Sequence, residues 1–402
     1  MQTRPLLAMA LILGLTGCGG EDGGTPAPAP APTPSPSPTP TPTPSPTATS
    51  VPALPTTAVN QRVVATFDNP WAMVFLPDGR MLVTEKTGQL QLVTQAGAKT
   101  QVSGVPRILY GGQLGLQDVV LDPGFATNAR VWISYAEPAG SNQQLAVARA
   151  TLDTGGTAPQ LRDLAVIWRA TPATTGGQLG ARLAFAPDGR TLFVSSGERQ
   201  QGTPAQDLSG TLGKIVRINL DGSAAAGNPF AATAGAKAEI WTLGHRNPYG
   251  LVFASDGRLF ESEMGPAGGD EFNLIEPGKN YGWPRVSEGD NYDGTPIPRH
   301  STNTAYTAPL VSWTPVIAPA GMIQYRGTAF VGWDGDFLLA GLVQQGLVRV
   351  RVSGNSASEV ARIGLGARIR EVEQGPSGSL WVLRDGAGGA LVELTPVSRV
   401  VQ

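Results

Sequence analysis

Apolar and polar residues alternate over short stretches of this chain, and a turn rich in Asp and Gly precedes many of these stretches. Residues 75–85, FLPDGRMLVTE, are an example, because Pro-Asp-Gly favours a tight turn and the residues after Gly79 alternate as in a strand. The pattern returns as FAPDGRTLFVSSGE from Phe185 and as FASDGRLFESEMG from Phe253. We interpret each copy as a β-hairpin.

The hairpin turn, or a close relative of it, recurs along the chain at intervals of about 40 to 80 residues. A repeat of about 40 residues with four short strands is typical of a β-propeller blade, and longer intervals indicate blades with long loops. We therefore predict an all-β fold, a six-bladed β-propeller, over residues 57–402. A β-sandwich with frequent Asp-Gly turns is the alternative. The turns lie at Asp78-Gly79, Asp122-Pro123-Gly124, Asp188-Gly189, Asp256-Gly257, Asp334-Gly335 and Ser377-Gly378.

The two ends of this region are expected to share one blade. RVVATF, residues 62–67, precedes the first repeat, and ALVELTPV, which begins at Ala390, follows the last one. Pairing of these two segments would close the ring. A single blade cannot bury its own faces, so repetition around an axis is what buries each sheet against the next. We expect the long loops to gather at one end of the central channel and to carry the functional site there.

The first 56 residues indicate export and tethering. Arg4 followed by the apolar run Leu6–Leu15 predicts a signal peptide over residues 1–17, and the run is shorter than the roughly 20 residues of a membrane span. Residues 18–56 carry Pro at nearly every second place over most of their length, which predicts a disordered, extended linker. Cys18 is the only cysteine, which excludes a disulfide within the chain.

The LTGC sequence that ends at Cys18 resembles a bacterial lipobox. This resemblance implies a lipid-anchored protein of the cell envelope, in the outer membrane and facing the periplasm. The alternative is an ordinary signal peptide with an incidental cysteine. The charges of the whole chain nearly balance, with 29 basic and 31 acidic residues. Because a nucleic-acid partner normally requires a basic excess, we expect no nucleic-acid binding.

Three short segments carry candidate chemistry. In GHRNPYG, His245, Arg246 and Asn247 follow a strand, and the Arg-Asn pair offers N–H donors to carboxylates or quinone oxygens. A turn held by side-chain hydrogen bonds is the alternative there. Arg368 and Arg370 alternate around Ile369, so both point to one side of a strand, where they form either an anion site or a solvated edge.

The third segment, EMGPAGGDE at residues 263–271, combines carboxylates with a Gly- and Pro-rich backbone that leaves carbonyl oxygens free. Hard cations such as Ca²⁺ prefer several ligands of this kind. GDNYDG at residues 289–294 is also acidic, but it matches no complete Ca²⁺-loop pattern. We therefore expect a cation near the first of these two segments only.

Together with other motifs, these segments resemble the soluble glucose/sorbosone dehydrogenases that depend on pyrroloquinoline quinone (PQQ), especially the periplasmic aldose dehydrogenases. The resemblance covers about residues 60–396 and includes GQLGLQDVVLDPGF, LGARLAFAPDG, LGKIVRINLDG, GHRNPYG, GPAGGDEFN, NYGWP and RIREV in order. It implies a six-bladed propeller that oxidises an aldose to a lactone by hydride transfer to PQQ, with Ca²⁺ as second cofactor and an electron acceptor that is unknown.

The resemblance also implies roles for individual residues. Apart from the resemblance, we expect Trp313 in SWTPVIAP to line the entrance as a stacking platform for the substrate, with a core position as the alternative. Glu271 and the backbone of Tyr281 would bind a second, structural Ca²⁺, and the carbonyls of Gly265 and Pro266 would bind the Ca²⁺ at the quinone. The residues that match PQQ-contacting positions are Gln113, Arg246, Asn247, Arg368 and Arg370.

The chain departs from the family pattern at the catalytic base. Gln178 stands where a His is expected, followed four places on by Arg182, and Glu198 replaces the supporting Asp. A neutral amide cannot act as a general base. Three interpretations stay open: Glu198 acts as the base, PQQ binds without fast turnover, or the propeller is a tethered interaction module. Further departures are Val343 for a Lys, Tyr249 for a Gln and Met264 in the cation segment.

Two other six-bladed enzyme classes deserve comparison. Ca²⁺-dependent lactonases use an inward ring of Asn, Asp and Glu around one cation, and sialidases use three Arg residues with Tyr and Glu. Three Arg residues are available here, but the surrounding motifs match neither class. Sugar oxidation is therefore the predicted function, and a non-catalytic or PQQ-binding lipoprotein is the alternative.

Overall fold

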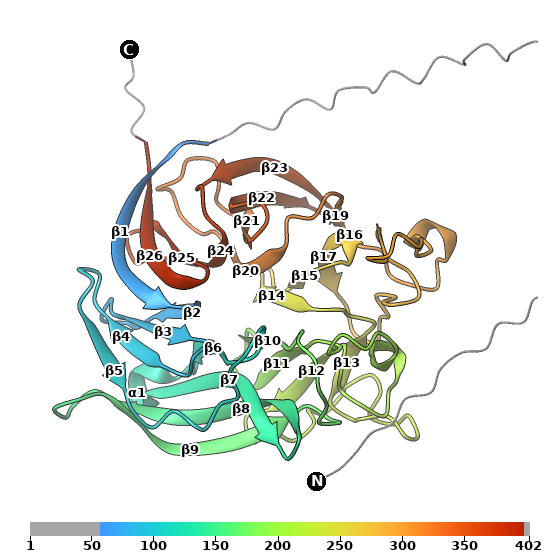
Figure 1. The fold of residues 1–402 in the computed structure, drawn as a ribbon, viewed down its shortest axis with the longest axis horizontal. Coiled ribbons are helices and arrows are strands. Elements are labelled where there is room, and N and C mark those ends of the chain that lie inside the picture. The colour runs from blue at the N-terminus through green and yellow to red at the C-terminus, as the bar shows by residue number, and fades with distance from the viewer. Residues whose placement is uncertain (1–56, 398–402) are drawn as a thin grey trace, which may run out of the picture. The chain divides into compact units, whose positions relative to one another are not determined.

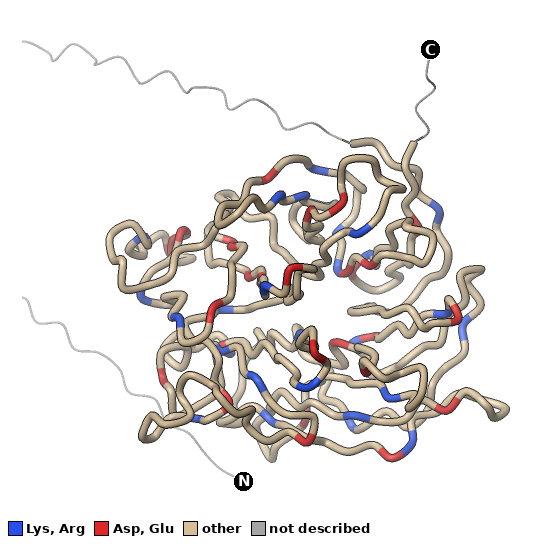
Figure 2. The backbone as a smooth tube through the Cα atoms, turned by 180° about the vertical axis from the view of Figure 1, so that it is seen from behind, with Lys and Arg blue, Asp and Glu red and all other residues tan. Residues whose placement is uncertain are grey.

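The computed structural model describes residues 57–397, so the predicted signal peptide, Cys18 and the linker lie outside the described part of the chain. Six four-stranded antiparallel sheets stand around a central axis (Figure 1). This confirms the six-bladed β-propeller. Within residues 57–397, no helix has the length and apolar character needed to cross a membrane. Lys, Arg, Asp and Glu are mixed along the backbone rather than separated by sign (Figure 2).

We number the blades in chain order, and in each of the first five the first strand is the innermost. Blade 1 contains β2 (Pro70–Phe75), β3 (Met81–Glu85), β4 (Leu90–Val93) and β5 (Lys99–Val102). Blade 2 contains β6 (Leu116–Leu121), β7 (Arg130–Ala139), β8 (Asn142–Asp153) and β9 (Gln160–Arg169). Blade 3 contains β10 (Gly180–Phe185), β11 (Thr191–Ser196), β12 (Lys214–Asn219) and β13 (Ile240–Leu243).

Blade 4 contains β14 (Pro248–Phe253), β15 (Leu259–Glu263), β17 (Asp270–Ile275) and β19 (Val311–Trp313). Blade 5 contains β20 (Pro319–Gln324), β21 (Phe337–Gly341), β22 (Gly346–Ser353) and β23 (Ser356–Gly364). Blade 6 contains β24 (Ile369–Gln374), β25 (Leu380–Arg384), β26 (Ala387–Pro396) and β1 (Val59–Asp68). Outside the blades lie the two-stranded sheet of β16 (Ala267–Gly268) and β18 (Gly289–Asp290), the short helix α1 (Phe125–Asn128) and the 3₁₀ turns Thr203–Gln206 and His300–Thr302.

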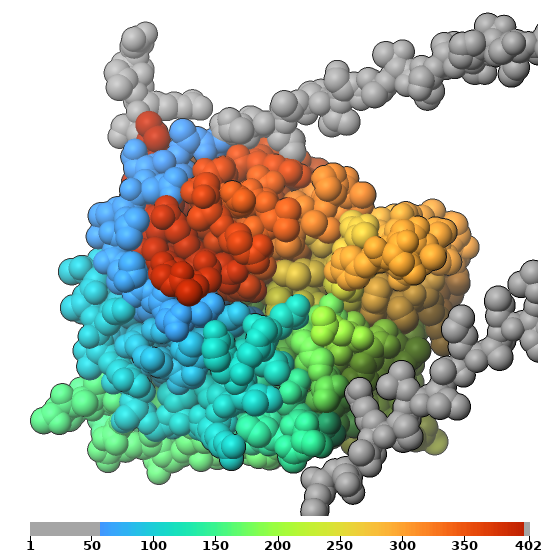
Figure 3. Space-filling model, viewed as in Figure 1, coloured from blue at the N-terminus to red at the C-terminus, as the bar shows by residue number. Residues whose placement is uncertain are grey.

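Blade 6 closes the ring in the predicted way. The first described strand, β1, pairs antiparallel with the last strand, β26, and places Val63 opposite Val392. In the space-filling view the blue N-terminal segment therefore lies against the red C-terminal one (Figure 3). The pairing ties the two ends of the propeller together with backbone hydrogen bonds.

Each interface between neighbouring blades is filled by its own cluster of buried apolar side chains. Strand β3 shows how one strand serves two interfaces. Leu82 packs toward blade 2, whereas Met81 and Val83 belong to the cluster shared with blade 6. Because successive side chains point to opposite faces of a strand and both faces are covered, MLVTE is buried along its whole length.

The recurring Asp-Gly turn connects the innermost strand of a blade to the next strand. In blade 1 the Asp78 carboxylate accepts hydrogen bonds from the backbone N–H and the Nε–H of Arg80, at 2.9 and 2.8 Å. Gly79 adopts φ +84°, a left-handed conformation that glycine tolerates best. The same backbone contact to Asp is made by Arg190 in blade 3 and by Arg258 in blade 4. The repeated motif is therefore a blade hairpin.

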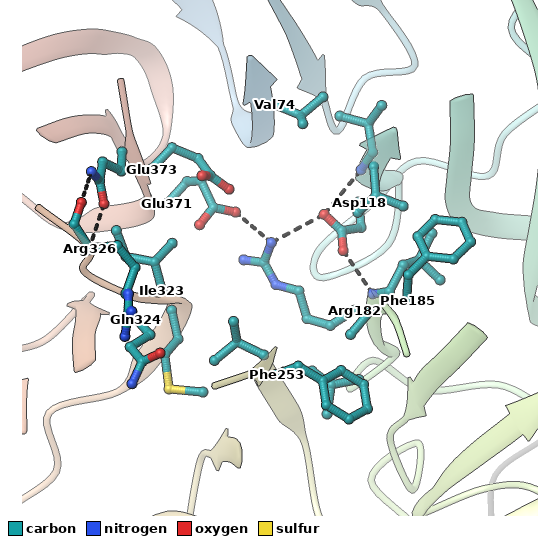
Figure 4. A pocket seen from close by; sticks show the side chains of 18 of the residues that line it. Val74, Asp118, Arg182, Phe185, Phe253, Ile323, Gln324, Arg326, Glu371 and Glu373 are labelled. Atoms are coloured by element: carbon teal, nitrogen blue, oxygen red, sulfur yellow. Dashed lines mark hydrogen bonds and ion pairs between the residues drawn. The ribbon is translucent and has the colours of Figure 1, made fainter. Parts of the chain in front are cut away.

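Arg182 lies on β10 and points into the channel between the blades (Figure 4). Its Nη1 donates to Asp118 of β6 at 3.3 Å and to Glu371 of β24 at 2.5 Å. Its Nε donates to the carbonyl oxygen of Tyr249 at 2.7 Å, and its guanidinium carbon lies 4.1 Å from the ring centre of Trp71. One side chain thus joins strands of blades 1, 2, 3, 4 and 6.

We expect Arg182→Met to lower the free energy of unfolding by about 3–5 kcal/mol, because it leaves two buried carboxylates without their counter-charge. Urea unfolding followed by tryptophan fluorescence measures the loss. Arg80→Met is the matched control, since the Arg80–Asp78 pair is largely exposed and contributes about 0–1 kcal/mol. Equal losses in the two variants would contradict a central role for Arg182.

Candidate active site

Two cavities occupy the two ends of the channel. Residues from the middle and later parts of the six inner strands, with Asp118, Arg182 and Glu371 among them, line one cavity of about 480 Å³ (Figure 4). The other, of about 540 Å³, is lined by residues that come just before the inner strands of blades 2 to 5, together with segments that follow the second strands of blades 3, 4 and 5. Most of the predicted site residues lie in this second cavity. They are Gln113, Gln178, Glu198, Arg246, Asn247, Gly265 and Pro266.

Arg246 is the cation at the centre of this cavity, and it is only 7% exposed. Its Nη1 donates to the carbonyl oxygens of Met264 and Gly265, at 3.0 and 2.7 Å. Its Nη2 donates to the hydroxyl of Tyr292 at 3.1 Å. The guanidinium carbon lies 5.2 Å from the ring centre of Trp283 and 5.7 Å from that of Tyr292, so the charged group is flanked by two aromatic rings.

Within the GHRNP segment, one residue holds a turn by side-chain hydrogen bonds and two others face the cavity. His245 is fully buried, stacks on Tyr281 at 4.8 Å and contacts Glu263 through Nδ1 at 3.1 Å. The other carboxylate oxygen of Glu263 accepts the backbone N–H of Arg246. Asn247 faces the cavity instead, with its Oδ1 accepting the backbone N–H of Gly180 at 3.3 Å. His245 and Glu263 therefore fix the turn, and the next two residues reach the cavity.

The amide of Gln178 is already used within the protein. Its side-chain Oε1 accepts the backbone N–H of Gln200 at 3.2 Å, and its own backbone N–H donates to Oε1 of Gln113 at 2.6 Å. Gln178 adopts φ 51°, so the backbone turns sharply just before β10. These contacts hold the wall of the cavity together, and none of them supplies a proton acceptor.

Glu198 is the candidate residue whose carboxylate can act as a general base. Only 2% of its surface is exposed, yet it lines the cavity. Its Oε2 accepts the backbone N–H groups of Gln201 and Gly202, and within residues 57–397 its Oε1 has no hydrogen-bond partner. Burial raises the pKa of Glu198 above its ordinary value, although the two backbone N–H groups oppose the shift. The carboxylate is thus held by one oxygen and free at the other.

Asp270 anchors the loop that carries Gly265 and Pro266. Its carboxylate accepts three backbone N–H groups, from Gly265 at 2.9 Å and from Ile317 and Ala318 at 2.7 Å each. Burial raises the pKa of Asp270 to about 6. The loop of blade 4 is thereby fastened to the segment that leads into the inner strand of blade 5.

Glu271 and Tyr281 do not line the main cavity. They border a narrow space beside it, together with Gly265, Glu263 and Ser287. The Tyr281 carbonyl oxygen lies 3.0 Å from Nε2 of His300. Burial, then the nearby Glu263 carboxylate, raises the pKa of Glu271 well above its ordinary value. An added cation would compensate this crowding of acidic groups.

Arg368 and Arg370 lie to the side of the cavity rather than in its lining. Both donate to the carboxylate of Asp385, at 3.1 and 3.0 Å from their Nε atoms. The Arg368 side chain is half exposed, whereas the Arg370 guanidinium is buried with its carbon 5.7 Å from the ring centre of Tyr249. The two Arg side chains therefore point to the same side, as predicted, but the Asp385 carboxylate partly neutralises their positive charge.

Trp313 was expected at the entrance, and the structure contradicts this. The side chain is 4% exposed, packs in the cluster between blades 4 and 5, and donates from Nε1 to Glu359 at 2.7 Å. Sequence reasoning also missed two aromatic residues of the cavity, Trp283 and Tyr292. Trp283 lies in the NYGWP motif, and Tyr292 lies in the acidic segment that matched no Ca²⁺ loop.

The whole propeller is similar to known proteins. The family model described as Glucose / Sorbosone dehydrogenase matches residues 67–393. The chain is 36% identical over 352 residues to the aldose sugar dehydrogenase YliI of Escherichia coli (strain K12), which covers 86% of this chain and 94% of that protein.

Solved structures agree with this match. The apo-form crystal structure of the soluble aldose sugar dehydrogenase from Escherichia coli has a TM-score of 0.80 at 36% identity and covers 85% of this chain and 100% of that one. The PQQ-bound form of an aldose sugar dehydrogenase from Streptomyces coelicolor has a TM-score of 0.69 at 28% identity and covers 85% and 99%.

We expect Asp270→Asn to loosen the loop that presents the Gly265 and Pro266 carbonyls, because an amide nitrogen would then face backbone N–H donors. The free energy of unfolding should fall by about 1–3 kcal/mol, and the amide of Gly265 should exchange faster in hydrogen-exchange measurements. Asp256→Asn is the control, since that carboxylate sits in an exposed hairpin turn. Unchanged exchange at Gly265 would contradict the anchoring role.

Proposed function

The chain belongs to the glucose/sorbosone dehydrogenase family, and we propose that it oxidises aldose sugars to lactones with PQQ as the hydride acceptor. One observation supports the proposal above all. A single cavity brings together the Arg246–Asn247 pair, the carbonyl-bearing Gly265–Pro266 turn and the buried carboxylate of Glu198. This set combines anion binding, cation binding and proton acceptance in one place.

The residues of the cavity fit PQQ, which carries several carboxylates and two quinone oxygens. The volume of about 540 Å³ lies within the usual range of cofactor sites. Within residues 57–397, the buried Nε of Arg246 has no acceptor, so an oxygen of the cofactor would satisfy it. Asn247 and Gln113 would bind further oxygens, and Arg370 with Arg368 would add positive charge from the side.

The donor set beside Arg246 fits Ca²⁺. The carbonyl oxygens of Gly265 and Pro266 are hard ligands. The Gly265 oxygen already accepts Nη1 of Arg246 at 2.7 Å, so it would bind Ca²⁺ through its second lone pair. Gly265 is confined, since a Cβ there would lie 2.3 Å from the carbonyl oxygens of Gly268 and Gly269. Glu271 and the Tyr281 carbonyl would hold a second Ca²⁺ in the neighbouring space. When bound, PQQ takes up the hydride and Ca²⁺ polarises its quinone carbonyl.

The reaction needs a group that accepts the proton of the anomeric hydroxyl while the C1–H bond breaks. The electron pair of that bond leaves with the hydride, and C1=O forms as the lactone carbonyl. We assign the proton to the free Oε1 of Glu198, because Oε2 is held by Gln201 and Gly202. Gln178 keeps a structural role, since its carbonyl oxygen is engaged by Gln200.

The proposed activity is tested by dye-linked oxidation of a panel of aldoses with the purified chain. We expect turnover only when both PQQ and Ca²⁺ are supplied, and loss of turnover when a chelator removes Ca²⁺ before PQQ is added. Heat-treated protein is the control. Absence of turnover with every sugar, together with no change in PQQ absorbance on titration, would refute the proposal.

We expect Glu198→Gln to lower kcat by about 10²- to 10⁴-fold, the usual contribution of a general base, while PQQ binding measured by absorbance titration is retained. The wild-type rate should fall as the pH drops through the raised pKa of Glu198, because the base must be ionised. The residual rate of the variant should lack this dependence. Glu198→Asp, which shortens the side chain, is the matched control and should keep the pH dependence at a reduced rate.

If Glu198→Gln instead retains the full rate, another group accepts the proton. Gln178→His then becomes the informative variant, because it restores the base that is expected at that position. A marked rise in kcat in Gln178→His alone would indicate that the wild-type chain is catalytically impaired.

A further inference from the structure

Tyr292 stands in the lining of the cavity and is 77% exposed. We propose that its ring is the surface on which the pyranose ring of the substrate is held, which makes Tyr292 a specificity-determining residue. The inference rests on the proposed function. It also replaces the sequence-based expectation for Trp313, whose buried ring cannot meet a ligand.

The position of Tyr292 is fixed before any ligand arrives. Its hydroxyl accepts a hydrogen bond from Nη2 of Arg246 at 3.1 Å, and the Arg246 guanidinium carbon lies 5.7 Å from the ring centre. The residue sits in a tight turn in which the backbone N–H of Asn291 donates to the carbonyl of Thr295 at 2.9 Å. Gly294 closes this turn at φ +85°, where a larger residue would be strained.

The acidic residues around Tyr292 are committed to holding this loop. Asp290 accepts a hydrogen bond from Arg299 at 2.8 Å, and Asp293 accepts the backbone N–H of Thr295 at 2.9 Å. Residues 289–294, which are acidic like a Ca²⁺ loop, therefore form a turn that presents the Tyr292 ring. Its carboxylates are used for structure, and the Tyr292 ring is the large group left facing the cavity.

The loop is also joined to the cation-binding turn. Strand β18 (Gly289–Asp290) pairs with β16 (Ala267–Gly268), which follows Gly265 and Pro266 directly. Movement of one loop would therefore displace the other. This coupling holds the ring of Tyr292 at a set position relative to the carbonyl oxygens and to Arg246.

The rest of the lining suits one class of ligand. Val316, Ala318 and the half-exposed Val343 supply an apolar wall, and Glu198 and Asn247 supply polar groups. A pyranose has a face of C–H groups and an edge of hydroxyls. Its C–H face matches the negative face of an aromatic ring, and its hydroxyl edge matches the polar wall. Because the ring is already ordered, binding costs little conformational entropy.

The test compares Tyr292→Ala, Tyr292→Phe and the control Tyr110→Ala in the PQQ- and Ca²⁺-loaded enzyme. Tyr110 is an exposed tyrosine, 48% exposed, that does not line the cavity. We expect Tyr292→Ala to raise KM for aldopyranoses about 3- to 10-fold with kcat within twofold. Tyr292→Phe keeps the ring and should change KM less than twofold, and Tyr110→Ala should match the wild type.

A separate readout distinguishes substrate contact from support of Arg246. PQQ affinity is measured by absorbance titration without sugar, and we expect it to be unchanged in Tyr292→Phe and Tyr292→Ala. If both variants weaken PQQ binding equally and leave KM unchanged, Tyr292 only positions Arg246 and the inference is overturned. An unchanged KM in Tyr292→Ala also overturns the inference about Tyr292. The proposed function is unaffected by that result as long as the wild type oxidises aldoses. If the wild type oxidises no sugar, both the proposed function and the inference about Tyr292 are refuted.

Discussion

Arg182 lies where strands from five blades come together on the axis, and its contacts explain why the propeller holds one shape. Its guanidinium bridges Asp118 and Glu371, donates to the backbone of Tyr249 and lies over Trp71. Desolvated charges of this kind are costly unless all partners are present. The blade interfaces are apolar and packed, and this ion cluster adds a polar contact in which strands of five blades must meet at one point.

The active-site cavity depends on this arrangement, because its residues come from different blades. The segments before the inner strands contribute Gln178, Asn247 and Ala318, and the turn after β15 contributes Gly265. Few of these residues are adjacent in the chain. Hydrogen bonds between loops then fix the details, and Asp270 is the clearest example, since it joins blade 4 to the start of blade 5. A rigid scaffold with functional loops is the usual way in which one fold supports precise chemistry.

Buried carboxyl groups lie in the wall of the cavity and in the narrow space beside it, and burial is the main cause that raises the pKa of each. Glu198, Asp270 and Glu271 share this cause. Backbone N–H groups hold the first two, so their oxygens are ordered before a ligand binds. For Glu271 the crowding of acidic groups favours a cation, and for Glu198 the raised pKa strengthens the carboxylate as a proton acceptor. The same physical effect therefore serves metal binding in one place and proton transfer in another.

Local sequence determined the hairpin repeat, the number of blades and the turns that carry Arg246, Asn247 and Gly265, because period-two alternation and Asp-Gly turns act over a few residues. Only the tertiary structure decided which side chains reach the cavity. Trp313 is buried because it finds Glu359 on another blade, and Arg368 and Arg370 lie aside because both find Asp385. Glu359 lies 46 residues from Trp313, and Asp385 lies 17 and 15 residues from Arg368 and Arg370, at the end of the neighbouring strand. Neither the alternation nor the turn pattern encodes these side-chain contacts. Packing and ion pairing in the folded chain therefore decide which of the candidate residues face the cavity.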